Sequence, residues 1–312
     1  MTRSYAILGT GAIGGFYGAK LQRAGFDVHF LLRSDYEYAK RRGLVVESID
    51  GDITLPEIQA YNQSQDIPNC DVVVIALKTT HNHQLSELLI PFTKSNSILL
   101  ILQNGLGVEP EVAKIAPNQT ILGGLCFICS NKVGKGRIRH IDYGAITLGG
   151  YAKQYQPAGI TDELHQIAED FTQAGIGIET SENLLLTRWK KLVWNIPYNS
   201  LSVILDARTD ELMQDSATRI LVEEIMQEVV LGAAACDRTI SQAFVDKMLT
   251  HTEKMKPYLT SMKLDFNHKR PLEIDAILGN PLRMAAESGQ HLPRIETLYR
   301  QLQFLDQQNR DQ

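Results

Sequence analysis

The fold is decided near the amino terminus, where residues 5–14 read Tyr5-Ala6-Ile7-Leu8-Gly9-Thr10-Gly11-Ala12-Ile13-Gly14. A short apolar run leads directly into Gly-x-Gly-x-x-Gly, and a helical pattern over residues 12–24 follows. In the strand, turn and helix that this order predicts, Gly9 permits the tight turn, Gly11 lets the backbone approach a pyrophosphate, and Gly14 lets the helix pack closely on the strand. The N–H groups and positive dipole end of the helix would face the phosphates. We therefore predict a dinucleotide site at residues 9–14.

The end of the second predicted strand, residues 27–32, indicates which dinucleotide binds. An NAD site usually carries an acidic residue there, which hydrogen-bonds the ribose hydroxyls. This strand is followed by Arg33 and Ser34, and a planar guanidinium suits a 2′-phosphate. Two other interpretations stay open: Arg33 as a solvated strand-end charge, and Asp35 as an acid that still reaches a ribose. The strand end favours NADP.

Composition sets the outer bounds of the interpretation. A chain of 312 residues exceeds the usual size of a single core, so two domains are expected. The net charge of −5 argues against nucleic acid as a partner, and the basic run at residues 40–42 is interpreted as the solvated end of a surface helix. Neither a bilayer-spanning apolar run nor a leader-peptide pattern occurs, so no membrane association is expected and the chain is predicted to be cytoplasmic.

Neither the cysteines nor the histidines follow a metal-site pattern. Cys126 and Cys129 lie in an apolar strand pattern without a second pair, which favours buried thiols over zinc or a redox couple. His81 and His83 lack a third ligand in the sequence, so no metal is expected.

The two halves of the chain differ in pattern. Residues 1–180 alternate strands and helices, and the continuous apolar runs at residues 71–77 and 97–102 predict buried parallel strands. From residue 181 the apolar positions repeat with helical periodicity. We predict an α/β domain over residues 1–180, a Rossmann-type doubly wound sheet with extra strands, followed by an all-helical domain over residues 181–312. Ligands in such enzymes commonly bind between domains.

The individual elements follow from the same patterns. Asp50-Gly51 between two short strands predicts a hairpin. Further strands are expected at residues 137–142 and 145–148. Helices are expected at residues 80–89, 108–115, 160–174, 182–205, 217–236, 241–254, 274–287 and 293–303.

Polar residues that directly follow buried parallel strands are candidates for ligand binding, since ligands bind outside the carboxyl ends of such strands. Lys78 follows the first of the two apolar runs, and Asn104 follows the second. Both are expected to face the cofactor crevice. The alternative is a solvated strand end at Lys78 and an ordinary turn at Asn104-Gly105.

The first long helix of the second half carries a polar stripe. Lys191, Asn195 and Asn199 recur at every fourth position and therefore line one face, among mostly apolar neighbours. Such a stripe suits a ligand-filled cleft, although an exposed amphipathic face would give the same spacing. Pro197 predicts a kink or interruption. Further on, Ser261 by itself predicts a helix cap, and Glu273 and Asp275 predict first-turn acids.

With these motifs in order, nearly the whole chain resembles the ketopantoate reductase (2-dehydropantoate 2-reductase) family. The motifs that carry the resemblance are Gly9-Thr10-Gly11-Ala12-Ile13-Gly14, Leu77-Lys78, Gln103-Asn104-Gly105-Leu106-Gly107, Trp189-Lys190-Lys191-Leu192 with Asn195 and Asn199, Ser261-Met262, and Glu273-Ile274-Asp275. Each is weak alone, but their common order and spacing are specific.

The resemblance implies a role for each of these residues. Lys191 resembles the family's general acid, and Glu273 its substrate-binding carboxylate. Residues that bind or orient ketopantoate are implied at Asn104, Asn195, Asn199 and Ser261. Cofactor contacts to NADP(H) are implied at Gly9, Thr10, Gly11, Ala12, Ile13, Gly14, Arg33, Lys78 and Asn104.

The function expected from the resemblance is NADPH-dependent reduction of ketopantoate to pantoate for pantothenate and coenzyme A synthesis. Ser200 stands where the family often has proline, and Thr209 where some members have a substrate-binding asparagine. These departures leave open a reductase of another branched 2-oxoacid. A nonenzymatic NADPH sensor is a further alternative, disfavoured because Lys191 and Glu273 accompany the cofactor motif. The expected partners are a small 2-oxoacid and, at most, a second copy of the chain in a homodimer.

Overall fold

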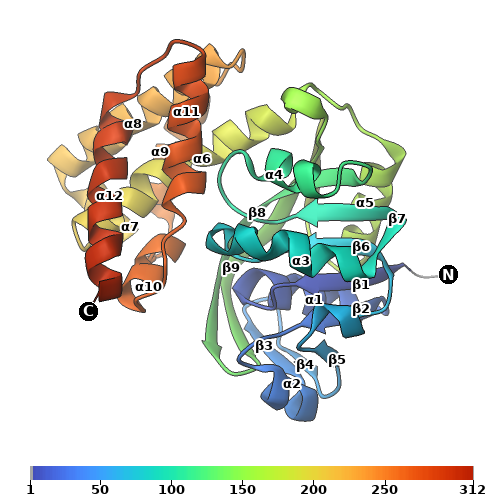
Figure 1. The fold of residues 1–312 in the computed structure, drawn as a ribbon. Coiled ribbons are helices and arrows are strands. Elements are labelled where there is room, and N and C mark those ends of the chain that lie inside the picture. Colours follow the sequence, from blue (N-terminus) through green and yellow to red (C-terminus); the bar gives the residue numbers. More distant parts are fainter. Residues whose placement is uncertain (1–2, 312) are drawn as a thin grey trace. The chain divides into compact units, whose positions relative to one another are not determined.

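The computed structural model describes residues 3–311, which form two compact units (Figure 1). The first unit contains the chain up to Gln103 together with Val108–Leu184. The second contains Asn104–Gly107 together with the described residues from Leu185 onward. The β-sheet lies in the first unit, and the second is built from helices. Between residues 3 and 311, none of the helices has the length and apolarity that crossing a membrane requires.

Six parallel strands run inward from one edge of a ten-stranded sheet, in the order β5-β2-β1-β6-β7-β8. This is the doubly wound order, in which the chain reverses its direction of travel across the sheet between β1 and β6. The strands are β1 Ser4–Leu8, β2 Asp27–Leu31, β5 Gln59–Tyr61, β6 Cys70–Ile75, β7 Thr93–Ile101 and β8 Thr120–Gly134. The predicted Rossmann-type fold is confirmed.

The extra strands extend the sheet beyond β8. They are β9 Arg137–Gly150, antiparallel to β8, then β3 Leu44–Ser48 and β4 Ile53–Leu55, with β10 Ile178–Ser181 also paired to β9. The hairpin predicted at Asp50-Gly51 is confirmed by the antiparallel β3–β4 pair. The two strands predicted at residues 137–148 are one strand, because a bulge at Tyr143 and Gly144, both with positive φ, shifts the register without ending the pairing.

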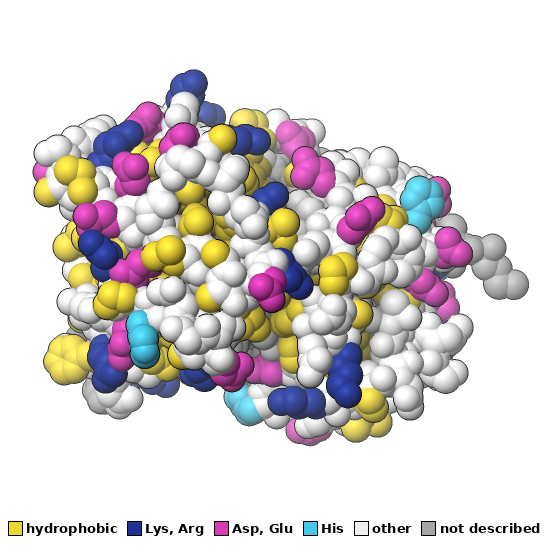
Figure 2. Space-filling view, turned by 90° about the horizontal axis from the view of Figure 1, so that it is seen from above, with side chains coloured by type: hydrophobic (Ala, Val, Ile, Leu, Met, Phe, Trp, Pro, Cys, Tyr) yellow, Lys and Arg dark blue, Asp and Glu magenta, His cyan; other side chains and the backbone are white. Residues whose placement is uncertain are grey.

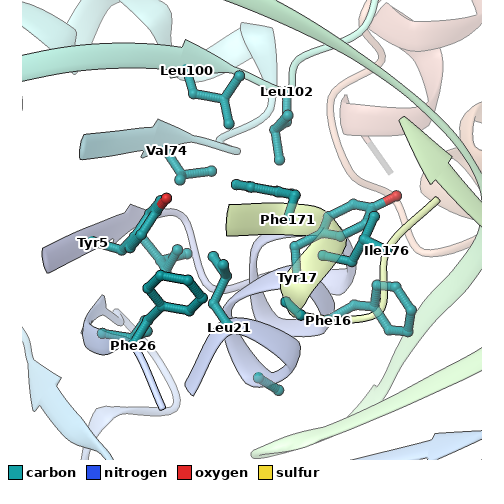
Figure 3. Packing of buried hydrophobic residues seen from close by; sticks show 14 of the residues in the cluster. Tyr5, Phe16, Tyr17, Leu21, Phe26, Val74, Leu100, Leu102, Phe171 and Ile176 are labelled. Carbon is teal, nitrogen blue, oxygen red and sulfur yellow. The ribbon is translucent and has the colours of Figure 1, made fainter. Parts of the chain in front are cut away.

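Alternate residues of the parallel strands face two helical layers. Tyr5 and Ile7 pack into the cluster that includes side chains of α1 (Ala12–Arg23) and α5 (Asp162–Gln173), as Figure 3 shows for Tyr5, Tyr17 and Phe171. Ala6 and Leu8 face α3 (Leu85–Leu89) and α4 (Val108–Ile115) instead. Because both faces are covered, these strands are apolar on both sides, which produced the continuous runs in the sequence.

Helices α1, α4 and α5 lie within two residues of their predicted bounds, but the helix predicted at residues 80–89 is shorter. The stretch predicted as a helix from residue 80 is a 3₁₀ turn, Thr79–Gln84, followed by α3. Helix α2, Tyr36–Arg42, ends in the exposed basic residues 40–42, as predicted.

The second unit contains more helices than the sequence predicted. They are α6 Leu184–Ile204, α7 Thr209–Gln214, α8 Ser216–Ala235, α9 Gln242–Lys254, α10 Ser261–Asn267, a π-helix Asp275–Gly279 that continues into α11 Asn280–Glu287, and α12 Pro293–Asp311. Helices α7 and α10 were not predicted, because six or seven residues give too few turns to establish a period. Helix α6 continues through Pro197 without interruption.

Charged side chains of both signs are interspersed over the surface seen in Figure 2.

Candidate active site

The turn after β1 has the geometry of a phosphate-binding loop. Gly9 adopts a φ of +100°, and a Cβ at this position would lie 2.7 Å from the backbone nitrogen of Leu77. A Cβ on Gly14 would overlap the carbonyl oxygen of Gly9. A Cβ on Gly11 would meet no described atom within 4 Å. The protein's own packing therefore requires glycine at positions 9 and 14, whereas position 11 borders open space that a ligand can fill.

The N-terminus of α1 presents its N–H groups to that space without a competing side chain. Gly11 is the N-cap, no side chain caps the helix, and its first turn contains no acidic residue. Unpaired N–H groups and the positive helix end suit a phosphate. The Thr10 hydroxyl donates a 2.9 Å hydrogen bond to the carbonyl of Leu31, which ties the glycine loop to the end of β2. Residues 9–14 fit the pyrophosphate of a dinucleotide.

Two charged residues that follow β2 differ in exposure: one is an exposed cation and the other is a buried acid. Arg33 and Ser34 are exposed, and among residues 3–311 the Arg33 guanidinium makes no ion pair. Asp35 is buried, and its carboxylate accepts hydrogen bonds from Lys132 Nζ at 2.6 Å and from the Gly136 N–H at 2.9 Å. The acid that the sequence left free to reach a ribose is thus held by the hairpin of β8 and β9.

The loops after β6 and β7 are joined by Gln103, a motif residue to which sequence reasoning assigned no role of its own. Lys78 lies half-buried just before the 3₁₀ turn. The Gln103 side-chain amide donates to the carbonyl of Leu77 at 3.0 Å and to Oδ1 of Asn82 at 2.7 Å. A glutamine at the end of a buried strand was the available signal, since a buried amide requires partners.

Asn104 belongs to the second unit by its contacts, although it follows a strand of the first. Within that unit, the Leu106 N–H donates a 2.8 Å hydrogen bond to the carbonyl of Ala276. Gly105 has a φ of +91°, and a Cβ there would overlap the same carbonyl oxygen. The Asn104 loop is therefore seated on the π-helix, which is a rare element that is frequently found at functional sites.

The polar stripe of α6 is largely buried. Asn195 and Asn199 are 7% and 2% exposed, whereas Lys191 is half-exposed. The interpretation of the stripe as an exposed amphipathic face is therefore wrong. The neighbouring Lys190 is turned toward α9, with its ammonium 5.6 Å from the centre of the Phe244 ring.

Helix α6 fixes the position of Ser261 through two hydrogen bonds. Asn199 Oδ1 accepts a 3.4 Å bond from the Met262 N–H, and the Ser202 and Thr260 hydroxyls lie 2.7 Å apart. Ser261 was predicted as a cap, and this was wrong: Thr260 is the N-cap of α10, and its hydroxyl accepts the Lys263 N–H. Ser261 is the first residue of the helix.

Glu273 lies immediately before the π-helix and is only 5% exposed. Its carbonyl accepts the Ile277 N–H at 3.1 Å, so its backbone is part of the helical turn. The six residues that sequence reasoning connected with substrate all belong to the second unit: Asn104, Lys191, Asn195, Asn199, Ser261 and Glu273.

A Rossmann-type unit with a phosphate-binding loop, followed by a helical unit with a lysine and buried amides on one helix face, defines a nicotinamide-dinucleotide-dependent oxidoreductase. Comparison with known proteins narrows this class. The family model described as ketopantoate reductase PanE/ApbA matches residues 5–153, and the model of its C-terminal domain matches residues 183–306. The chain belongs to the ketopantoate reductase family.

Individual relatives agree with this assignment along the full length. A 2-dehydropantoate 2-reductase of Nostoc sp. is 62% identical over 99% of this chain and 97% of its own length. The crystal structure of 2-dehydropantoate 2-reductase from Geobacter metallireducens superimposes with a TM-score of 0.91 at 41% identity, covering 98% of this chain and 99% of that one. The crystal structure of the enzyme of the same name from Methylococcus capsulatus superimposes with a TM-score of 0.88 at 32% identity. It covers 98% of this chain and 97% of that one.

Proposed function

We propose that the chain catalyses the NADPH-dependent reduction of 2-dehydropantoate (ketopantoate) to pantoate, a step of pantothenate and coenzyme A synthesis. The observation that carries the proposal is the 62% identity to a 2-dehydropantoate 2-reductase over 99% of the chain. Bound NADPH supplies a hydride from C4 of its nicotinamide ring to the 2-oxo carbon. The protein's residues bind the cofactor, orient the substrate and protonate the 2-oxo oxygen.

On the cofactor side, residues 9–14 bind the pyrophosphate through the N–H groups of the loop and of α1. Arg33 binds the 2′-phosphate, which its exposed guanidinium is able to contact bidentately. Lys78 and Asn104 contribute further contacts from the loops after β6 and β7. The open space at Gly11 supports this assignment, because a side chain there would compete with the phosphates.

On the catalytic side, Lys191 is the general acid. In its cationic form it stabilises the negative charge that develops on the 2-oxo oxygen and then donates its proton to that oxygen. Lys190 is not equivalent, because its ammonium lies over the Phe244 ring. The two lysines are one residue apart, about 100° around the helix.

The substrate is held by polar groups of the second unit, of which Asn195 and Glu273 are buried. Glu273 accepts a hydrogen bond from the terminal hydroxyl of ketopantoate, and Asn104, Asn195 and Ser261 donate to or orient its oxygens. Asn199 acts on Ser261, through its bond to the Met262 N–H.

Neither of the two sequence departures introduces a new charge. Thr209 donates its hydroxyl to the carbonyl of Tyr258 at 3.4 Å, and its own N–H donates to the same carbonyl at 3.2 Å. The side chain thereby joins the start of α7 to the segment before α10. Ser200 is fully buried within α6.

The test is steady-state NADPH oxidation by the purified chain with ketopantoate, 2-oxoisovalerate and pyruvate. We expect kcat/KM to be highest for ketopantoate and higher with NADPH than with NADH. If the protein prefers another branched 2-oxoacid, the proposed reaction type stands but the proposed substrate is wrong. NADPH binding without turnover of any 2-oxoacid would favour the sensor alternative. We also propose a homodimer, which light scattering distinguishes from a monomer by the twofold difference in mass.

A further inference from the structure

We propose that Lys132 is a second residue that selects NADPH over NADH, and that it acts by neutralising Asp35, the acid that follows Arg33 and Ser34. The inference rests on the proposed dependence on NADPH. Lys132 is a positioning and charge-balancing residue: it acts through Asp35.

The geometry of Asp35 shows that its carboxylate is committed to the β8–β9 hairpin. It stands at the N-cap of α2, where an aspartate ordinarily accepts an N–H of its own helix, yet it makes no such bond. Lys132 Nζ donates at 2.6 Å, the Gly136 N–H at 2.9 Å and the Ser34 hydroxyl at 3.2 Å. The Asp35 side chain is 6% exposed. Its orientation is therefore set by partners outside its own helix.

The carboxylate is ionised at neutral pH. Burial by itself would raise the pKa of Asp35, but hydrogen bonds from Lys132 and from the Gly136 N–H outweigh burial and lower the pKa below its ordinary value. A negative charge therefore stands two residues from the arginine expected to bind a 2′-phosphate. A carboxylate at this strand end is the feature that favours a ribose over its phosphate.

Lys132 makes the local charge positive. Arg33 and Asp35 alone sum to zero, and Lys132 makes the three-residue total +1. With the lysine removed, the acid would repel a 2′-phosphate and would become available to ribose hydroxyls. The lysine thus lets an acid remain at this strand end in a protein that binds NADPH.

Contacts with α2, β3 and α1 fix the position of the β8–β9 hairpin, and with it the position of Lys132 beside Asp35. Gly136 has a φ of +61°, and a Cβ there would lie 2.8 Å from the Tyr38 ring of α2. The Gly136 carbonyl accepts the Val45 N–H at 2.8 Å, which fixes the turn to β3. Two residues before Lys132, the Ser130 hydroxyl donates to the carbonyl of Ala12 at 3.3 Å. Strand β8 therefore contacts both the glycine loop and the N-cap of α2.

The experiment measures the Kd of NADPH and of NADH for Lys132→Gln, Asp35→Asn and the double variant at low ionic strength. Lys132→Gln should lower the preference for NADPH about tenfold, the size expected for one charge near a protein surface, and added salt should shrink the effect. Adding Asp35→Asn to Lys132→Gln should restore most of the preference for NADPH, because the carboxylate charge that Lys132 no longer neutralises is then absent. Asp35→Asn alone should retain the preference for NADPH.

Lys135→Gln is the matched control, since it removes the same charge from an exposed position of the same hairpin. It should leave the ratio of the two Kd values unchanged. A purely structural brace would weaken both cofactors equally and leave the double variant no better than Lys132→Gln, and that outcome would overturn the inference. If Lys132→Gln does not fold, Asp35→Asn decides, because loss of the NADPH preference in it contradicts the proposal. If the wild-type protein itself does not prefer NADPH, the proposed cofactor is wrong, which is a different outcome from failure of the Lys132 proposal.

Discussion

The N–H of Leu106 donates a 2.8 Å hydrogen bond to the carbonyl of Ala276, which joins the loop after β7 to the π-helix. This bond connects positions 170 residues apart, which is more than half of the 312-residue chain. It brings Asn104 into the same compact unit as Glu273.

Replacing Gly105 by alanine should break this connection. The residue has a φ of +91°, and the new Cβ would overlap the Ala276 carbonyl oxygen. We expect a loss of about 2–4 kcal/mol in the free energy of unfolding, from backbone strain together with overpacking. Gly289→Ala is the control, because Gly289 has a φ of +80° but no described atom within 4 Å of a Cβ. Urea unfolding of the two variants compares them, and equal losses would mean that the contact with Ala276 is unimportant.

Replacing Arg33 by alanine should weaken NADPH binding far more than NADH binding. The guanidinium is exposed at the end of β2 and matches a 2′-phosphate, which NADH lacks. Fluorescence titration with both cofactors measures the effect. Arg42→Ala, at the exposed end of α2, should alter neither Kd appreciably. Equal weakening of both cofactors by Arg33→Ala would contradict the assignment.

Replacing Lys191 by alanine should lower kcat by about a hundredfold or more, because the variant loses both a proton donor and a stabilising charge. Lys190→Ala should have little effect on kcat, since that ammonium lies over the Phe244 ring. Steady-state NADPH oxidation at saturating ketopantoate compares the kcat values, and circular dichroism verifies that both variants are folded. Similar activity in the two variants would show that the general acid lies elsewhere.

Replacing Glu273 by alanine should reduce kcat/KM for ketopantoate much more than for 2-oxoisovalerate. The latter substrate lacks the terminal hydroxyl, and sites built to bind a hydroxyl reject such analogues by up to about 10⁴-fold. The ratio of kcat/KM for the two substrates should therefore shrink. Glu287→Ala, which removes an exposed carboxylate at the end of α11, should leave the ratio unchanged. An unchanged ratio in Glu273→Ala would assign Glu273 to general positioning.

Two serines of α6 should respond oppositely to alanine. Both are fully buried, but among residues 3–311 the Ser200 hydroxyl has no hydrogen-bond partner, whereas Ser202 lies 2.7 Å from the Thr260 hydroxyl. Ser200→Ala should be neutral or stabilising by up to about 1 kcal/mol, and Ser202→Ala should destabilise by about 1–2 kcal/mol. Urea midpoints measure both. Equal destabilisation would show that Ser200 has a structural partner.

Elements with strong local signals were predictable because their causes lie in neighbouring residues. The glycine loop, the buried strands and the long helices each carry a pattern that one face or one turn imposes, and β1, β6 and α8 lie within a few residues of the predicted bounds. Helices α7 and α10 are too short to show a period. The bulge at Tyr143 and Gly144 depends on pairing with β8, which no local pattern records.

The sequence by itself determined the dinucleotide fold, the stripe of Lys191, Asn195 and Asn199, and the position of Arg33 after the second strand, since each follows from the order and spacing of residues along one element. Only the tertiary structure decided which partner each polar group takes. Asp35 could equally have capped its own helix or reached a ribose. Its carboxylate instead binds Lys132, a residue 97 positions further along the chain that the sheet order of β8 and β9 brings to it. A hydrogen bond between distant residues depends on how strands pair, and that pairing is a property of the assembled sheet.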